Sequence, residues 1–124
     1  MIHRIETEGR YAQAVRTGDL VFLAGQVADD RTADFNTQCA QVFARVERLL
    51  AAAGASKSSL LQMQVWLKDL QHYAAFNALY DAWIDPANKP ARATVKADLV
   101  APELLVEIMA TARREDAGAA RGAP

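Results

Sequence analysis

Residues 35 to 53 carry apolar side chains at spacings of three and four, the period of an α-helix with one buried face. Thr32 or Asp34 can cap the start of this helix, and Gly54 can end it. A helix with one apolar stripe depends on a second layer of structure that covers the stripe, so the rest of the chain has to supply that layer. The stripe consists of Phe35, Cys39, Val42, Phe43, Val46, Leu49, Leu50 and Ala53, and the opposite, solvated face holds Gln38, Gln41, Arg45, Glu47 and Arg48.

Segments with the two-residue period of β-strands stand on both sides of this helix. Before it, a turn at residues 17–19 separates the two halves of a hairpin, and residues 20–24 form its largely buried second strand. After it, residues 60–68 alternate like a strand. One face of that strand holds Leu61, Met63, Val65 and Leu67, and the other holds Gln62, Gln64, Trp66 and Lys68.

The last third of the chain predicts one more helix and two more strands. Asp69 is placed to cap a helix that stops before Pro86. The two strands, at about residues 92–99 and 104–112, are joined by a turn around Ala101 and Pro102. The side chains that this helix buries are Phe76, Leu79, Tyr80 and Trp83.

The order of strands, helix, strand, helix and strands predicts an α+β fold, a two-layer sandwich of a mixed, about six-stranded sheet with two helices on one face. Residues 1–113 are expected to form a single domain, and residues 114–124 a disordered tail. No third helix remains to cover the other face of the sheet, which indicates an interface between copies of the chain. That face is expected to hold Gln62, Gln64, Trp66, Leu105 and Met109.

Charge and cysteine content limit the possible functions. Fourteen basic and fifteen acidic residues leave a formal charge of −1, so no positive field is available to attract nucleic acid. A single cysteine, Cys39, excludes an internal disulfide and fits a reducing compartment. The apolar stretches are too short to span a bilayer and the chain opens with no signal peptide, so a cytoplasmic protein is expected.

The sequence lacks the common patterns of metal and nucleophile sites. His3 and His72 have no second histidine or cysteine at ligand spacing, so no metal site is expected. Cys39 lies on the apolar stripe of the first helix and is interpreted as a core residue.

Glu107 is a carboxylate in the middle of an apolar strand. Burial there disfavours the charged form and raises the pKa, which is typical of functional sites. The alternative is structural: across a hairpin that turns at residues 101 and 102, Lys96 falls opposite Glu107 as an ion-pair partner. In that register Arg92 lies on the same face as Glu107, roughly 13 Å along the strand.

Arg92 is the second candidate. Pro90 fixes its approach, and the small side chains of Ala91 and Ala93 leave room for a ligand. A fixed guanidinium binds a carboxylate through two parallel hydrogen bonds, which suits a small organic acid. The alternative interpretation is a surface arginine at the start of a strand.

Short segments along the chain resemble the RidA/YjgF family, the reactive intermediate deaminases, and most closely its shorter members. They occur in order and at compatible spacing over about residues 8–112, and such a set of matches is more specific than any one segment alone. The matching segments are Gly9–Val15, Leu20–Gln26, the stretch around Ala53-Gly54-Ala55-Ser56, Val65–Asp69, Phe76-Asn77 with Tyr80, Pro90-Ala91-Arg92 and Val106-Glu107-Ile108.

This resemblance implies a two-layer sandwich like that of a bacterial chorismate mutase, assembled as a homotrimer with a cleft at each subunit interface. It implies hydrolysis of imines and enamines, such as 2-aminoacrylate or 2-imino acids, to 2-keto acids and ammonia without a metal or cofactor. The expected partner is a small carboxylate-bearing substrate, with no nucleic acid and no membrane.

By the same resemblance, Arg92 binds the substrate carboxylate, Glu107 holds or activates the attacking water, and Tyr11 closes the cleft from a neighbouring subunit. The resemblance further implies that the site is lined by Asn77, Thr94 and the backbone of Gly25.

Two departures from the family pattern bear on the substrate. Ala24 stands where many members have serine, and Thr94 where many have cysteine. Three functions stay open: a deaminase with Arg92 and Glu107 as its essential pair, a trimeric binder of small carboxylic acids without turnover, and, less favoured, an endoribonuclease, a label that some relatives carry.

Overall fold

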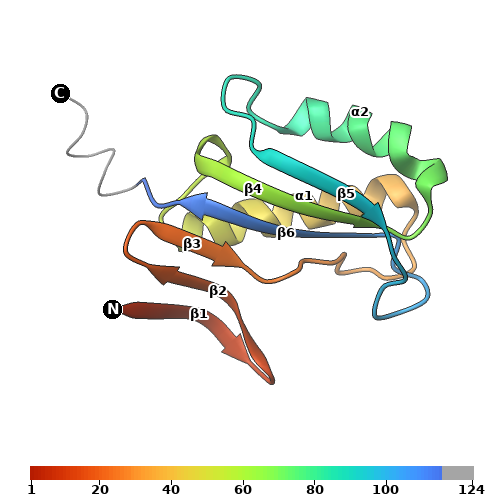
Figure 1. Ribbon diagram of the computed structural model, residues 1–124. Helices are drawn as coiled ribbons and strands as arrows, with labels where there is room; N and C mark the ends of the chain where they lie inside the picture. The colour runs from red at the N-terminus through yellow and green to blue at the C-terminus, as the bar shows by residue number, and fades with distance from the viewer. Residues whose placement is uncertain (116–124) are drawn as a thin grey trace.

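The computed structural model describes residues 1–115, whose strands and helices are labelled in Figure 1. Of the expected tail, Arg114 and Glu115 belong to the described residues, and their backbone N–H groups donate to the carbonyls of Asp19 and Gly54. Residues 116–124 lie outside the described residues. The elements are β1 (Ile2–Glu8), β2 (Tyr11–Thr17), β3 (Leu20–Leu23), α1 (Phe35–Ala52), the 3-10 turn η1 (Lys57–Ser59), β4 (Leu60–Leu67), the 3-10 turn η2 (Leu70–His72), α2 (Tyr73–Trp83), β5 (Ala91–Lys96) and β6 (Val106–Arg113).

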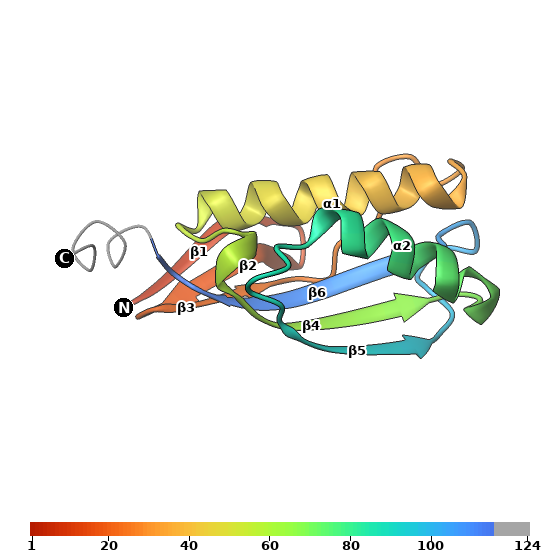
Figure 2. The same ribbon diagram turned by 90° about the horizontal axis from the view of Figure 1, so that it is seen from above.

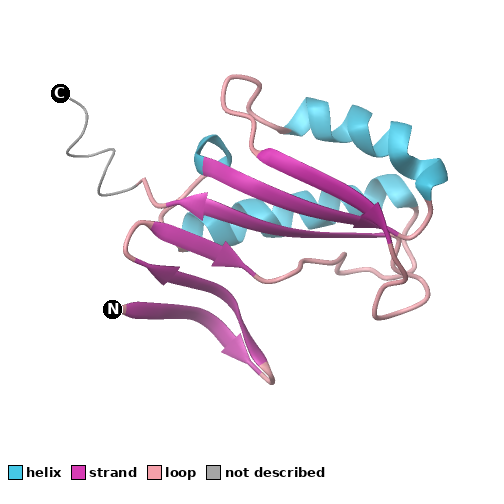
Figure 3. Cartoon of the chain, in the orientation of Figure 1, coloured by secondary structure: helices cyan, strands magenta, loops and turns pink. Residues whose placement is uncertain are grey.

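The described strands form one six-stranded sheet in the order β1-β2-β3-β6-β4-β5. The β4–β5 pair is parallel and the other neighbouring pairs are antiparallel, so the sheet is mixed. Figure 2 shows α1 and α2 on one side of the sheet, and Figure 3 gives the same arrangement by type of element. The predicted α+β two-layer sandwich is therefore confirmed. No helix of residues 1–115 is long and apolar enough to cross a membrane.

The last two strands do not form the hairpin that the alternative interpretation of Glu107 required. β6 lies between β3 and β4, whereas β5 pairs with β4 at the edge of the sheet. Because α2 connects β4 to β5, these two strands can lie parallel as a strand–helix–strand unit, and β5 is then separated from β6. Lys96 pairs with Leu67 and Glu107 pairs with Trp66, so residues of β4 separate them. The alternative interpretation of Glu107 as the ion-pair partner of Lys96 is therefore excluded.

The predicted stripe of α1 forms the centre of the core. Val42, Val46, Leu49 and Leu50 are fully buried, and the Asp34 side chain caps the helix by accepting the Thr37 N–H at 2.8 Å. This hydrogen bond lowers the pKa of Asp34.

The expectation that Gln38 faces solvent is wrong. Gln38 is fully buried because its amide connects α1 to two loops. Its Nε2 donates to the carbonyls of Arg31, Ala33 and Glu103 at 3.2, 3.0 and 3.0 Å, and its Oε1 accepts the Leu105 N–H at 2.9 Å. The side chain thereby pairs three backbone carbonyls and one backbone N–H.

The predicted faces of β4 hold except at its first residues. Met63, Val65 and Leu67 are buried under the helices, but Leu61 is 46% exposed and Leu60 takes its place in the core. A register shift between Leu60 and Gln62 causes the exchange. Asp69 caps η2 rather than α2, since its side chain accepts the Gln71 N–H.

Candidate functional site

Arg92 lies on the face of the sheet that the helices cover. It pairs with buried Met63 of β4, and paired residues of neighbouring strands point to the same face. Its Nη2 donates to Oδ1 of Asn77 at 2.8 Å. The guanidinium carbon lies 4.6 Å from the ring centre of Tyr80 and 5.6 Å from that of Phe76, both on α2. The guanidinium is thus held by neutral groups.

Thr94 continues this arrangement along β5. It pairs with Val65, so it shares the face of Arg92. Its Oγ1 is buried and has no hydrogen-bond partner among the described residues. Buried polar groups are normally paired, so this hydroxyl is available to a ligand or water. We refer to Arg92, Asn77 and Thr94 as the arginine cluster.

Glu107 lies on the opposite, uncovered face. It pairs with Trp66, which is three residues from Met63 on β4 and therefore points the other way. The carboxylate lies against Gly25: a Cβ on that glycine would be 2.0 Å from Oε2. Burial raises the pKa of Glu107 above its ordinary value.

A buried glutamine holds the segment that carries Gly25. The backbone of Gln26 pairs with that of Ile108 through hydrogen bonds of 2.8 and 3.1 Å. Its side chain donates to the Gln13 side chain and the Ala24 carbonyl, and accepts from Nε of Arg45 at 3.0 Å. These contacts fix the backbone next to Glu107.

The two candidate residues therefore do not meet within one chain. The shared face of Arg92 and Glu107 held only for a hairpin register, and it does not occur because β4 lies between β5 and β6. Tyr11 is 57% exposed and lies on the uncovered face, since Ala14, three residues further along β2, is fully buried under the helices. Tyr11 and Glu107 are separated by β3. A single copy holds Asn77, Thr94 and Arg92 together, and Gly25 with Glu107.

The uncovered face of the sheet is rich in apolar surface. Figure 2 shows no described element on this side. Trp66 is half-buried there, whereas Leu105, expected on the same face, packs against the core instead. The exposed apolar side chains on it, 41 to 57% accessible, are Tyr11, Leu20, Phe22, Val95 and Met109.

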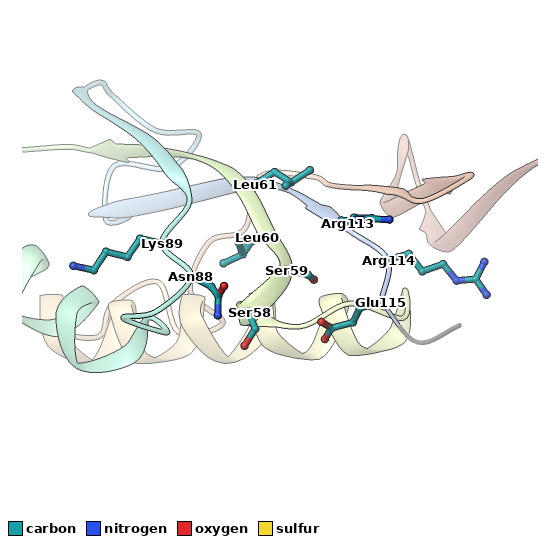
Figure 4. Close-up of a pocket in the computed structure, with 9 residues that line it drawn as sticks. All are labelled: Ser58, Ser59, Leu60, Leu61, Asn88, Lys89, Arg113, Arg114 and Glu115. Atoms are coloured by element: carbon teal, nitrogen blue, oxygen red, sulfur yellow. The ribbon is translucent and has the colours of Figure 1, made fainter. Parts of the chain in front are cut away.

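A pocket of the described residues lies elsewhere. It has a volume of about 570 Å³ and none of the candidate site residues lines it. In Figure 4 the Lys89 and Arg114 side chains extend outward in opposite directions, so these cations do not converge on a ligand. Its lining residues are Ser58, Ser59, Leu60, Leu61, Asn88, Lys89, Arg113, Arg114 and Glu115.

Two chemical features bear on other reaction types. Residues 1–115 contain no group of three or more His, Cys, Asp or Glu side chains able to hold a metal ion. Cys39 is 1% exposed, and burial raises the pKa of its thiol to about 12. The interpretation of Cys39 as a core residue is confirmed.

From the sequence, Phe76 and Tyr80 are interpreted as part of the buried face of a helix and are not assigned to the site. The sequence feature that could have placed them in the site is their spacing: they stand one helical turn apart, on either side of Asn77. The close approach of Gly25 to Glu107 had no local signal, since it depends on which strand lies beside β6.

Comparisons with known proteins agree with this architecture. The sequence matches the endoribonuclease L-PSP family over residues 1–114. A RutC family protein of Haemophilus ducreyi is 34% identical over 112 residues, which span 90% of this chain and 96% of that protein. The RutC family protein YoaB of Escherichia coli is 35% identical over 107 residues, 86% of this chain and 93% of that protein. A crystal structure of a YjgF family member from Neisseria meningitidis has a TM-score of 0.86 at 37% identity, covering 94% of this chain and 97% of the other.

Proposed function

The chain belongs to the endoribonuclease L-PSP family, whose members also carry the names RutC and YjgF, and we propose that it hydrolyses imines and enamines of small carboxylic acids to 2-keto acids and ammonia. Suitable substrates are 2-imino acids and 2-aminoacrylate-like enamines. The proposal includes a homotrimer whose sites lie between subunits, with Arg92, Glu107 and Tyr11 as catalytic residues.

The environment of Arg92 carries this proposal. A guanidinium held by an amide oxygen and two aromatic rings keeps its full charge for an incoming anion. None of the ion pairs of residues 1–115 includes Arg92, so a substrate carboxylate has no internal competitor. The free hydroxyl of Thr94 on the same face offers one more hydrogen bond.

Glu107 supplies the proton transfers. An iminium carbon is already electrophilic, so hydrolysis requires a positioned water and a base rather than a strong nucleophile. As the water oxygen bonds to the iminium carbon, the Glu107 carboxylate takes a water proton and a carbinolamine forms. Glu107 then returns the proton to nitrogen, the C–N bond breaks, and the hydroxyl proton leaves with ammonia as ammonium while the keto group forms. General acid–base catalysis of this kind contributes about 10²–10⁴-fold.

A complete site on this account needs two copies of the chain. Arg92 and Glu107 point to opposite faces of one sheet, so the Arg92 of one copy has to meet the Glu107 of another. The exposed apolar side chains of the uncovered face supply a surface for such an assembly. Tyr11, on that same face, is expected to close the cleft from a neighbouring copy.

A binder without turnover would use the same arginine cluster but would have no need for a base. Replacement of Glu107 by glutamine separates the two functions: hydrolysis is lost while binding of a stable carboxylate such as pyruvate persists. An endoribonuclease fits the chain less well, because its formal charge is −1 and RNA binding depends on clustered positive charge.

The test is a coupled assay. An amino-acid oxidase generates 2-imino acids in the cuvette, and semicarbazide traps what the protein leaves. Wild type is expected to suppress trapping and Arg92→Ala to behave like buffer, whereas the control Arg113→Ala, at an exposed arginine outside the cluster, behaves like wild type. If semicarbazide traps as much imine with wild type as with buffer, for 2-imino acids with several different side chains, the deaminase proposal is contradicted.

A further inference from the structure

Two aromatic side chains of α2 form a support for Arg92. Phe76 and Tyr80 are one helical turn apart, with ring centres 5.9 Å from each other, and both contact the guanidinium. Phe76 is fully buried and Tyr80 is 6% exposed, so the core fixes both rings. We propose that Tyr80, backed by Phe76, is a positioning residue that orients Arg92 for a substrate carboxylate; this inference rests on the proposed role of Arg92.

The geometry separates the two uses of the guanidinium. An aromatic ring attracts a cation over its face, and the 4.6 Å distance between Tyr80 and the guanidinium carbon lies within the usual range of such contacts. Hydrogen bonds leave the guanidinium along its edges, where it has five N–H donors. Asn77 accepts one bond, from Nη2, so edge donors remain for the two oxygens of a carboxylate.

Aromatic rings also hold Arg92 without neutralising it. A carboxylate in the position of Tyr80 would fix the guanidinium equally well but would compete with the substrate. The acidic residue next to Tyr80 in the chain, Asp81, is solvent-exposed and forms no ion pair with Arg92 in residues 1–115. The ring therefore supplies rigidity and leaves the charge available.

The contact predicts an electrostatic coupling between Tyr80 and the ligand. Burial raises the pKa of the Tyr80 phenol, the positive charge of Arg92 lowers it, and Asp81 raises it. An anion bound to Arg92 offsets the positive charge. The pKa of Tyr80 is therefore expected to rise when a carboxylate binds.

The experiment compares variants of the assembled protein with pyruvate as the probe. Tyr80→Leu is expected to raise the Kd of pyruvate and the KM of the imine about tenfold with kcat nearly unchanged, whereas Tyr80→Phe, which keeps a ring, stays within about threefold of wild type. Tyr73→Leu, at a half-exposed tyrosine of the same helix, is the matched control and is expected to bind like wild type. Thermal unfolding confirms that each variant is folded.

A measurement on the wild-type side chain avoids dependence on the leucine variant. In protein labelled with carbon-13 at tyrosine Cζ, the Tyr80 resonance is titrated with and without saturating pyruvate. A higher Tyr80 pKa with pyruvate supports the inference, and an unchanged value overturns it. A folded Tyr80→Leu that binds pyruvate like wild type also overturns it, as does a wild type that binds no pyruvate. If wild type binds pyruvate with the expected rise in the Tyr80 pKa but hydrolyses no imine, the proposed deaminase reaction is overturned instead, and the role of Tyr80 stands.

Discussion

Replacement of Gly25 by alanine is predicted to displace the Glu107 carboxylate. The new Cβ would lie 2.0 Å from Oε2 and 3.0 Å from Cδ of Glu107. The Gly25 backbone has little freedom to retreat, because neighbouring Gln26 is bonded to Ile108 through two backbone hydrogen bonds. The carboxylate ends a flexible side chain, so it moves instead, by about 1.4 Å before it reaches ordinary contact at 3.4 Å.

A displacement of this size is expected to affect catalysis far more than folding. A misplacement of about 1 Å can cost about 10²-fold in rate, so kcat for imine hydrolysis should fall about 100-fold. The free energy of unfolding should fall by about 1 kcal/mol, the lower end for an overpacked site, since one side chain can rotate away. The coupled imine assay measures the first effect and urea unfolding the second.

The matched control is Gly18→Ala. Gly18 has φ of +56° and no atom within 4 Å of an added Cβ, so alanine there costs about 1 kcal/mol of backbone strain without touching the site. Gly18→Ala should keep wild-type kcat. A Gly25→Ala protein with wild-type kcat would refute the reasoning, because it would mean that the position of the Glu107 carboxylate does not matter.

Three further predictions follow from single residues. Because burial raises the pKa of Glu107, kcat/KM should fall on acidification with an apparent pKa above 4.5. Glu107→Gln should be more stable than wild type at pH 7, because it buries no charge, and this difference should disappear below about pH 4, where Glu107 is protonated in the folded and the unfolded chain. Urea unfolding across pH measures the difference. Gln38→Leu should lower the free energy of unfolding by about 3 kcal/mol, because it leaves three carbonyls and an N–H unpaired. The control Gln41→Leu loses one hydrogen bond at a half-exposed position and should lower the free energy of unfolding by about 1 kcal/mol or less. Equal losses in the two variants would contradict this role of Gln38. Cys39, with a thiol pKa of about 12, should react with a thiol reagent only on unfolding, and rapid labelling of native protein would contradict its burial.

Local periodicity predicted most of the elements. The stripe of α1 and the buried face of β6 follow directly from apolar residues at helical and strand spacing, and the structure buries both as expected. The burial of Gln38 could not be predicted this way, because its side chain bonds to carbonyls of two loops. Arg31 lies 7 residues from Gln38 in the sequence, and Glu103 lies 65 residues from it.

The order of the strands in the sheet could not be predicted from the sequence pattern. A turn at Ala101 and Pro102 is compatible with a hairpin, but the helix between β4 and β5 makes a parallel pair possible, and local residues do not distinguish the two. The identity of Arg92 and Glu107 as candidates survives this error, since each stands out by its own residue type and neighbours. Their relative placement does not survive: Arg92 and Glu107 lie on opposite faces of the sheet, so on the proposed account they meet between copies of the chain.

Mixed oligomers test this central claim most directly. Arg92→Ala and Glu107→Gln proteins are each expected to be inactive, and they are unfolded together and refolded as a one-to-one mixture. If Arg92 and Glu107 of different copies share a site, about a quarter of the sites receive both native residues, and about a quarter of wild-type activity returns. Each variant refolded alone is the control. No recovery, in a mixture shown to contain hybrid oligomers, would contradict a site shared between copies.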